Sequence, residues 1–224
     1  MAISQQAISI SQDLLLSFKM NQPTQEYEQQ LAAITFEELN NQLNSDLKKQ
    51  AFWVNIYITY SQKLIQDNPD CGSKCKNKKH ITIANRVFSL NDILYKILLE
   101  SKSKVTGLQK IIVPKWEKAL RVNYPDGRVL LAMDSHEKIS DALSYYEPEK
   151  MDAQLDEVSI LFLNTFIHYD LDRNEVFIPS WIKHFKREFG YKEGMISGLK
   201  RAEVIGNDMK DTKIIYSDKI ASFK

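Results

Sequence analysis

The sequence is poor in glycine and cysteine, and both shortages exclude kinds of site. Only 7 of its 224 residues are glycine, so a glycine-rich loop that cradles phosphate groups is not expected. The 2 cysteines, Cys71 and Cys75, lie four residues apart and cannot form a disulfide framework. We therefore expect neither a glycine-rich nucleotide site nor a disulfide-stabilised scaffold.

Long apolar runs and a targeting segment are also missing. The most apolar stretch, residues 51–60, contains Asn55 and Thr59, so no membrane-spanning helix is expected. Residues 1–18 have no basic start and only the short apolar triplet Leu14–Leu16, which is unlike a signal peptide. These absences predict a soluble, cytoplasmic chain, although a chain trimmed of its leader would look the same.

Neither sign of charge dominates. The 30 basic and 29 acidic residues leave a net charge of +1, so no global field attracts nucleic acid or an anionic membrane. Hydrophobic residues at 43% and charged residues at 26% are ordinary for a globular protein. The length fits one large domain or two small ones, and no internal repeat is visible.

Capping and periodicity signals predict several helices. A first helix is expected over residues 9–20, and a second begins at Thr35, where Glu38 completes a capping box. The segment 51–60 is apolar on nearly all sides, which is typical of a central, buried helix. Further helices are predicted at residues 89–100, where Ser89 and Asp92 form a second capping box, and at residues 148–165 and 180–190.

Short strands are predicted near residues 81, 111, 129, 167, 175 and 214. The apolar run Arg128–Met133 reads as a buried strand, and residues 165–169 and 175–178 read as the arms of a hairpin. The predicted fold class is therefore α+β, with helices packed on a small, mostly antiparallel sheet. Residues 1–48 are expected to be a helical extension of the domain formed by residues 49–224, in one compact unit overall.

Four blocks of sequence carry a family resemblance. They are Phe52–Tyr57 (Phe-Trp-Val-Asn-Ile-Tyr), Val87–Ile93, Asp152–Leu163 and Ile178–Gly190. In this order and spacing they resemble a bacterial family catalogued as domain of unknown function 547, and together they cover about residues 50–191. The resemblance implies a fold neighbourhood but no reaction.

The chain departs from that family in one further block, which lies between Val87–Ile93 and Asp152–Leu163 in the sequence. The family has a strand with a histidine, followed by a loop with two cysteines. Here Leu130 stands at the histidine position, and Ser135 and Ser140 stand at the cysteine positions. Ile58 also replaces an asparagine that follows the first block. If the family loop carries thiol chemistry, we expect this chain to have lost it, because serine is neither a soft metal ligand nor a nucleophile without a paired base.

Serine catalysis at the same loop is the weaker interpretation. Asp134, Ser135 and His136 are consecutive, so at a strand end their side chains point to opposite faces and cannot align as a triad. We interpret residues 134–141 as a polar loop after a buried strand. Ser135, His136 and Ser140 are kept only as candidate catalytic residues.

Cys71, Cys75 and His80 offer three potential metal ligands in a lysine-rich loop. The spacing of the cysteines occurs in zinc sites, but no fourth ligand is evident. The neighbouring lysines would favour the thiolate form, so a redox-active pair or a labile disulfide is an alternative. We interpret the segment first as a solvated loop, and we predict no cofactor.

These observations favour a binding or interaction module that is a non-catalytic, degenerate member of its family. Its partner is unknown, and a protein is one candidate. Nucleic acid does not fit, because the lysines near residue 75 lack interleaved aromatic residues. The alternative is a hydrolase or transferase with a site near residues 134–141. That alternative requires an exposed serine hydroxyl within hydrogen-bond reach of an imidazole.

Overall fold

The structure, a computed structural model, describes residues 6–70, 72–99, 113–138 and 144–218. The chain divides into two compact units. Unit 1 contains residues 1–125 and 136–152, and unit 2 contains residues 126–135 and 153–224. Neither unit begins or ends at residue 48, where the sequence predicts a boundary. That boundary stays a prediction.

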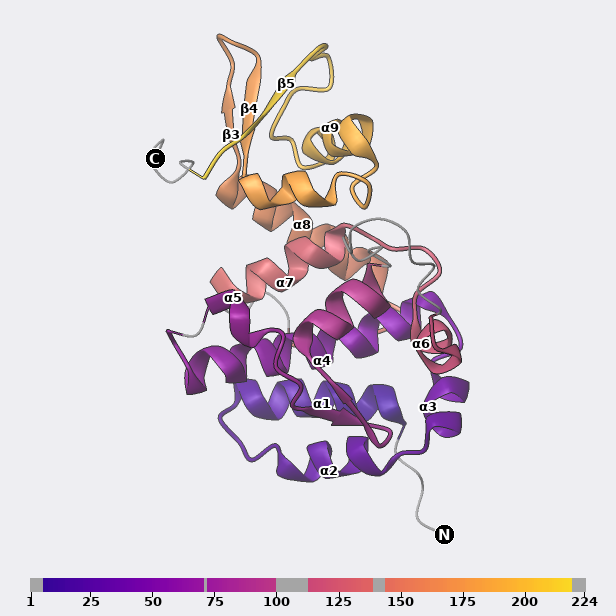
Figure 1. Cartoon of the computed structure of the whole chain (residues 1–224). Coiled ribbons are helices and arrows are strands. Elements are labelled where there is room, and N and C mark those ends of the chain that lie inside the picture. Colours follow the sequence, from indigo (N-terminus) through magenta and orange to yellow (C-terminus); the bar gives the residue numbers. More distant parts are fainter. Residues whose placement is uncertain (1–5, 71, 100–112, 139–143, 219–224) are drawn as a thin grey trace. The chain divides into compact units, whose positions relative to one another are not determined.

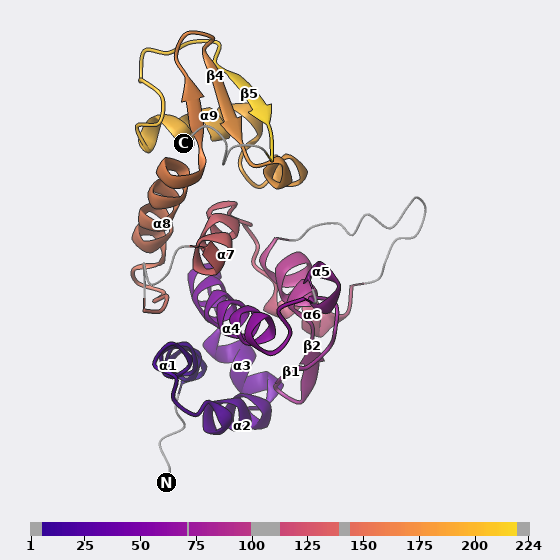
Figure 2. The same ribbon diagram turned by 90° about the vertical axis from the view of Figure 1, so that its left-hand side faces the viewer.

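Unit 1 is mainly helical and has one small hairpin (Figure 1). Its elements are α1 (Ala7–Lys19), α2 (Gln25–Ala33), α3 (Phe36–Gln42), α4 (Asp46–Asp67), α5 (Gly72–Cys75), β1 (Ile81–Ile83), β2 (Arg86–Phe88), the π-type helical segment η1 (Asp92–Leu98) and α6 (Lys115–Leu120). Strands β1 and β2 pair antiparallel, with Ile81 opposite Phe88. The long helix α4 packs against both α1 and η1 (Figure 2).

Helix α4 is the core of unit 1, as its apolar pattern predicts. The Ser45 hydroxyl accepts a hydrogen bond from the Lys48 N–H and caps the start of the helix. Every residue from Lys49 to Ser61 is buried. A helix that is covered on all sides removes a large apolar area from water, which is the main favourable term in folding.

A buried asparagine ties α4 to a segment that is distant in the sequence. Asn55 Nδ2 donates to the Tyr146 carbonyl at 3.0 Å, and Asn55 Oδ1 accepts from the Tyr146 N–H at 2.8 Å. Both residues are fully buried. The Gln12 side chain of α1 donates to the same carbonyl at 3.2 Å. Asn55 therefore pairs the buried Tyr146 N–H, and it shares the Tyr146 carbonyl with Gln12.

Two predicted capping boxes are confirmed. At the start of α3, the Thr35 hydroxyl accepts from the Glu38 N–H, and the Glu38 carboxylate accepts from the Thr35 N–H. Ser89 and Asp92 make the same exchange at the start of η1. The helix that Thr35 caps ends at Gln42, before α4 begins. Sequence reasoning missed α2 entirely.

Unit 2 combines helices with a three-stranded sheet. Its elements are the first part of α7 (Arg128–Lys138), most of α8 (Met151–Phe166), β3 (His168–Asp170), β4 (Glu175–Ile178), the 3₁₀ helix η2 (Ser180–Phe185), α9 (Tyr191–Arg201) and β5 (Lys213–Tyr216). The strand order is β3-β4-β5, with β3 antiparallel and β5 parallel to β4. The predicted hairpin and final strand are confirmed. Leu131, Phe162, Val176 and Leu199 are members of its core.

The strand predicted at Arg128–Met133 is wrong, because this segment begins helix α7. The Asp126 carboxylate accepts a hydrogen bond from the Arg128 N–H at 2.8 Å, in the manner of a helix cap. Periodicity alone cannot distinguish a buried strand from a buried helix in so short an apolar run. The strand predicted near residue 111 lies outside the described residues except for Val113. The described strands form two separate sheets rather than one.

The helix predicted over residues 180–190 is the short helix η2 followed by turns. Gly190 then has a left-handed φ of +70°, which glycine adopts without steric cost. Helix α9 begins directly after it, at Tyr191. Sequence reasoning missed α9 because Gly194 and Gly198 interrupt its helical pattern.

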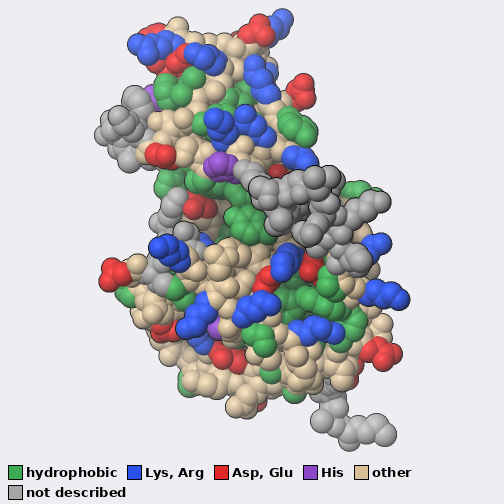
Figure 3. Space-filling model, in the orientation of Figure 1, with side chains coloured by type: hydrophobic (Ala, Val, Ile, Leu, Met, Phe, Trp, Pro, Cys, Tyr) green, Lys and Arg blue, Asp and Glu red, His purple; other side chains and the backbone are tan. Residues whose placement is uncertain are grey.

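On one face of the described residues, charged side chains of both signs are mixed. Figure 3 shows Lys and Arg side chains interspersed with Asp and Glu on the face that it displays. The near balance of charge in the sequence therefore extends to this face. Within the described ranges, no helix has both the length and the hydropathy needed to cross a membrane.

Replacing Asn55 with leucine, a side chain of similar size, should lower the free energy of unfolding by about 1 to 3 kcal/mol, because the buried Tyr146 N–H loses the Asn55 acceptor and the Tyr146 carbonyl loses one of its two side-chain donors. Urea denaturation followed by tryptophan fluorescence measures this change. Asn41→Leu, at an exposed position of α3, is the matched control and should change stability by less than about 0.5 kcal/mol. Equal losses in the two variants would contradict the role given to Asn55.

Candidate functional site

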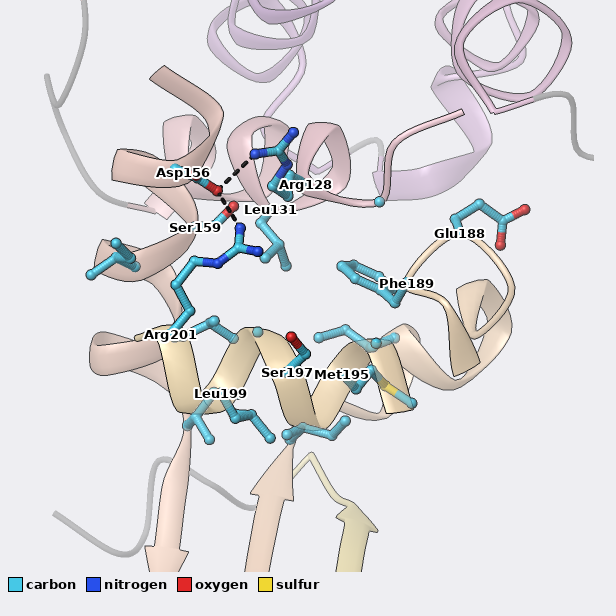
Figure 4. A pocket seen from close by; sticks show the side chains of 18 of the residues that line it. Arg128, Leu131, Asp156, Ser159, Glu188, Phe189, Met195, Ser197, Leu199 and Arg201 are labelled. Atoms are coloured by element: carbon cyan, nitrogen blue, oxygen red, sulfur yellow. Dashed lines mark hydrogen bonds and ion pairs between the residues drawn. The ribbon is translucent and has the colours of Figure 1, made fainter. Parts of the chain in front are cut away.

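Unit 2 contains a pocket of about 290 Å³. Figure 4 shows it between helices α7, α8 and α9, with Phe189 on a further side. Most of its lining side chains are apolar, and they include Leu131, Leu163, Ile178, Ile182 and Met195. A pocket of this volume lies at the low end of the range for small-molecule sites. All the lining residues that the structure describes belong to unit 2.

The pocket has space because one face of α9 carries small residues. Gly194, Ser197 and Gly198 line it, at spacings that place them on one side of the helix. A Cβ atom added to Gly198 would meet no other atom within 4 Å, so the volume beside this residue is open. A Cβ on Gly194 would lie 2.0 Å from the Phe189 carbonyl oxygen. Glycine at 194 therefore permits the close approach of α9 to the preceding loop.

A second close approach fixes the start of α7. The Gly127 N–H donates to the Glu188 carbonyl at 3.1 Å. A Cβ on Gly127 would come within 2.8 Å of that oxygen and of Phe189 Cδ1, so a larger residue would push the segments apart. The Asp126-Gly127 pair, which the sequence presents as a simple turn, thus starts a helix and forms part of the pocket wall.

One carboxylate links the three helices around the pocket. Asp156 Oδ1, on α8, accepts hydrogen bonds from Arg128 Nη1 of α7 at 2.7 Å and from Arg201 Nη1 of α9 at 3.0 Å (Figure 4). Arg128 also pairs with Asp126 through Nη2 at 2.7 Å. Arg128 is therefore held by two carboxylates, and Asp156 is held by two guanidinium groups.

Burial raises the pKa of the Asp156 carboxyl, but the hydrogen bonds and charges of Arg128 and Arg201 outweigh it and hold the pKa below its ordinary value. The carboxylate is therefore charged at neutral pH. The Arg201 side chain is 59% exposed, so its ion pair adds little to stability in water. The chief effect of the bridge is to position the two arginines beside the pocket.

A buried hydroxyl at the pocket has no partner. Ser159 is 6% exposed and lines the pocket, and its Oγ makes no hydrogen bond in the part of the chain that the structure describes. It lies about one turn along α8 from Asp156, so the two side chains share a helix face (Figure 4). An unpaired buried hydroxyl costs about 1 to 3 kcal/mol, and such groups are rare in folded proteins. The Ser159 hydroxyl is therefore available to a ligand.

This arrangement suits a small, largely apolar molecule with one polar end. Apolar side chains would cover the body of the molecule, while Ser159 and the Arg128–Asp156–Arg201 bridge would face its polar end. The described lining residues include two serines but no histidine and no cysteine. No group of His, Cys, Asp and Glu in the described ranges is arranged to hold a metal ion.

Of the predicted catalytic residues, Ser135 is described in full and is not among the lining residues of this pocket. Ser135 is on α7 rather than in a loop, is 1% exposed, and its Oγ has no hydrogen-bond partner among the described residues. The side chain of His136 and the whole of Ser140 lie outside the described residues. An activated serine needs an imidazole within reach, and the hydrolase alternative stays a prediction.

The three candidate metal ligands belong to unit 1. Cys75 ends the short helix α5 and is disulfide-bonded, and Cys71, the only other cysteine of the sequence, lies outside the described residues. His80 is exposed, and its Nδ1 lies 2.7 Å from the Lys78 carbonyl oxygen. A disulfide is one of the alternatives that the sequence offers for this loop, and it agrees with the disulfide-bonded Cys75. The metal site stays a prediction.

Sequence reasoning missed the residues of the pocket. From the sequence, Asp156 is explained as a solvent-facing helix residue, and Arg128 as the first residue of a strand. No local pattern brings Arg128, Asp156 and Arg201 together, because they lie on three different helices. The one usable signal is the set Gly194, Ser197 and Gly198, whose spacing marks a helix face that leaves space beside it.

The fold and the site define an α+β protein whose second unit encloses a small pocket. A family model described as "Protein of unknown function, DUF547" matches residues 39–163, which is more than half of the chain. The chain therefore belongs to the DUF547 family, as its sequence blocks predict. The match ends before α9, so Arg201 and the small-residue face lie beyond it. Neither the curated proteins nor the solved structures contain a match to the chain.

The pKa of Asp156 should rise in Arg201→Gln, because one of the two cations that lower it is removed. A carboxyl-detected NMR titration measures the midpoint. In the native chain the stability contributed by this carboxylate is present above the ordinary pKa of 3.8 and is lost as the pH falls through the lowered value. Arg173→Gln removes the same charge from the β3–β4 turn and should leave the midpoint unchanged. An unshifted midpoint in Arg201→Gln would mean that Arg201 does not pair with Asp156.

Proposed function

We propose that this chain is a binding module rather than an enzyme, and that unit 2 binds a small, largely apolar molecule. The observation that carries the proposal is the pocket of about 290 Å³ with the unpaired hydroxyl of Ser159 in its wall. Empty apolar space and an unpaired buried polar atom both cost stability. A ligand that fills the space and pairs the hydroxyl would remove both costs.

Two further features support binding over catalysis. Arg128 and Arg201 hold the pKa of the Asp156 carboxyl below its ordinary value, which makes this carboxylate a weak base for proton transfer. The resemblance implies that Ser135 and Ser140 replace the two cysteines of the family and Leu130 its histidine, so any thiol chemistry of that loop would be lost in this chain. The sequence leaves a protein as one candidate partner, but the pocket gives a small molecule the stronger support.

Gly198→Leu should abolish binding without unfolding unit 2. The leucine side chain would enter open space, and leucine favours the helix over glycine by roughly 0.8 kcal/mol. A ligand-observed NMR screen of apolar fragments, run on the native chain and on the variant, tests this. Fragments that bind the native chain should lose binding in Gly198→Leu.

The matched control places the same side chain elsewhere on α9. Lys192 is exposed and does not line the pocket, so Lys192→Leu should bind the same fragments as the native chain. Binding that survives in Gly198→Leu would place the ligand outside the pocket and overturn the proposal. So would a screen in which no fragment binds the native chain.

A further inference from the structure

The two arginines at the pocket are not equivalent. Arg128 donates through Nε and Nη2 to Asp126 and through Nη1 to Asp156, so both edges of its guanidinium are occupied. Arg201 donates one hydrogen bond to a described residue, from Nη1 to Asp156. A guanidinium has several N–H donors arranged as a fork. Most donors of Arg201 therefore remain for a ligand.

The Ser159 hydroxyl lies close to this fork in the fold. Ser159 and Asp156 share one face of α8, and Arg201 is tied to Asp156 at 3.0 Å. Figure 4 shows the Ser159 hydroxyl and the Arg201 guanidinium at the same end of the pocket. This end therefore offers an unpaired hydroxyl and a guanidinium that both donate, while the walls beyond it are apolar.

From this juxtaposition we propose that the ligand is an apolar molecule with a terminal carboxylate. The carboxylate accepts hydrogen bonds from Arg201 and from the Ser159 hydroxyl, and the apolar body lies against Leu163, Ile178 and Met195. A carboxylate matches the fork of an arginine with two parallel hydrogen bonds, which a single hydroxyl or carbonyl oxygen cannot do. This assignment rests on the proposed function, since it names the chemical class that the same pocket takes.

The local charge permits an anion. Arg128 and Arg201 balance Asp126 and Asp156, so these four side chains carry no net charge. The Glu188 carboxylate at the other side of the pocket is paired with Arg187 at 3.2 Å. A carboxylate at Arg201 therefore meets no unpaired negative charge among the described lining residues.

The volume sets the size of the ligand. An apolar cavity of about 150 Å³ accommodates one benzene molecule. A pocket of about 290 Å³ therefore accommodates roughly ten to twelve non-hydrogen atoms on the same scale. The probe 4-phenylbutanoate has this size and carries the required carboxylate, and 4-phenylbutanol is its neutral counterpart.

The test compares the affinities of these two probes for the full chain by NMR titration. The native chain should bind 4-phenylbutanoate at least about tenfold more tightly than 4-phenylbutanol, because charge-assisted hydrogen bonds exceed neutral ones. Arg201→Gln should remove this preference and leave the affinity for the alcohol within about twofold. Arg173→Gln, which removes an exposed arginine of the same unit, should keep the native preference.

Ser159→Ala separates a ligand contact from a structural role. Removing an unpaired buried hydroxyl should raise the melting temperature of the free chain, while the affinity for 4-phenylbutanoate should fall by about fivefold or more. Ser135→Ala removes another unpaired buried hydroxyl, one that does not line the pocket. It should also raise the melting temperature but leave binding unchanged.

The outcomes distinguish this inference from the proposed function. If both probes bind equally in the native chain and both are lost in Gly198→Leu, the pocket binds small molecules but the carboxylate assignment is wrong. If the preference for the carboxylate persists in Arg201→Gln, the assignment is also wrong. If neither probe binds the native chain, the assignment and the proposed function both fail.

Discussion

The pocket of unit 2 depends on one carboxylate shared between two guanidinium groups. Asp156 on α8 accepts from Arg128 of α7 and from Arg201 of α9, at 2.7 and 3.0 Å. Each contact is partly exposed and contributes little free energy by itself. Together they fix the relative positions of three helices at one end of the pocket. In the same bridge, both edges of the Arg128 guanidinium are hydrogen-bonded, whereas most N–H donors of Arg201 make no bond to a described residue. The bridge therefore also determines which donors this end of the pocket offers to a ligand.

Space in the pocket is kept open by residues too small to fill it. At Gly198 of α9, an added Cβ atom would contact no other segment within 4 Å, so glycine leaves space there that a larger residue could occupy. Close packing is the rule in protein interiors, and buried hydroxyls are nearly always paired. The open space and the unpaired Ser159 depart from these rules at one place. Departures of this kind are expected where a protein keeps a site for function.

Much of unit 1 could be predicted because its signals are local. The all-round apolar pattern of residues 51–60 identified α4 as buried, and the Thr35–Glu38 and Ser89–Asp92 pairs marked helix starts. These signals depend on neighbours within a turn or two of the chain. The link between Asn55 and Tyr146 was beyond such reasoning, because it joins residues 91 positions apart.

Unit 2 was harder to predict because its signals are ambiguous or tertiary. The run Arg128–Met133 fits a strand as well as a helix, and the cap at Asp126 decides in favour of the helix. The glycines that hid α9 from pattern analysis are the same residues that make the pocket. The bridge at Asp156 joins three helices and has no counterpart in local sequence. The fold class and the family were therefore within reach of the sequence, and the site was not.

The central claim is that this pocket holds a ligand by its polar end, and a crystal structure of the chain grown with 4-phenylbutanoate tests it most directly. The account predicts the phenyl ring between α8 and α9, with carboxylate oxygens at about 2.7 to 3.2 Å from Arg201 Nη atoms and from Ser159 Oγ. A ligand bound elsewhere, or bound with its carboxylate in solvent and Ser159 still unpaired, would contradict it.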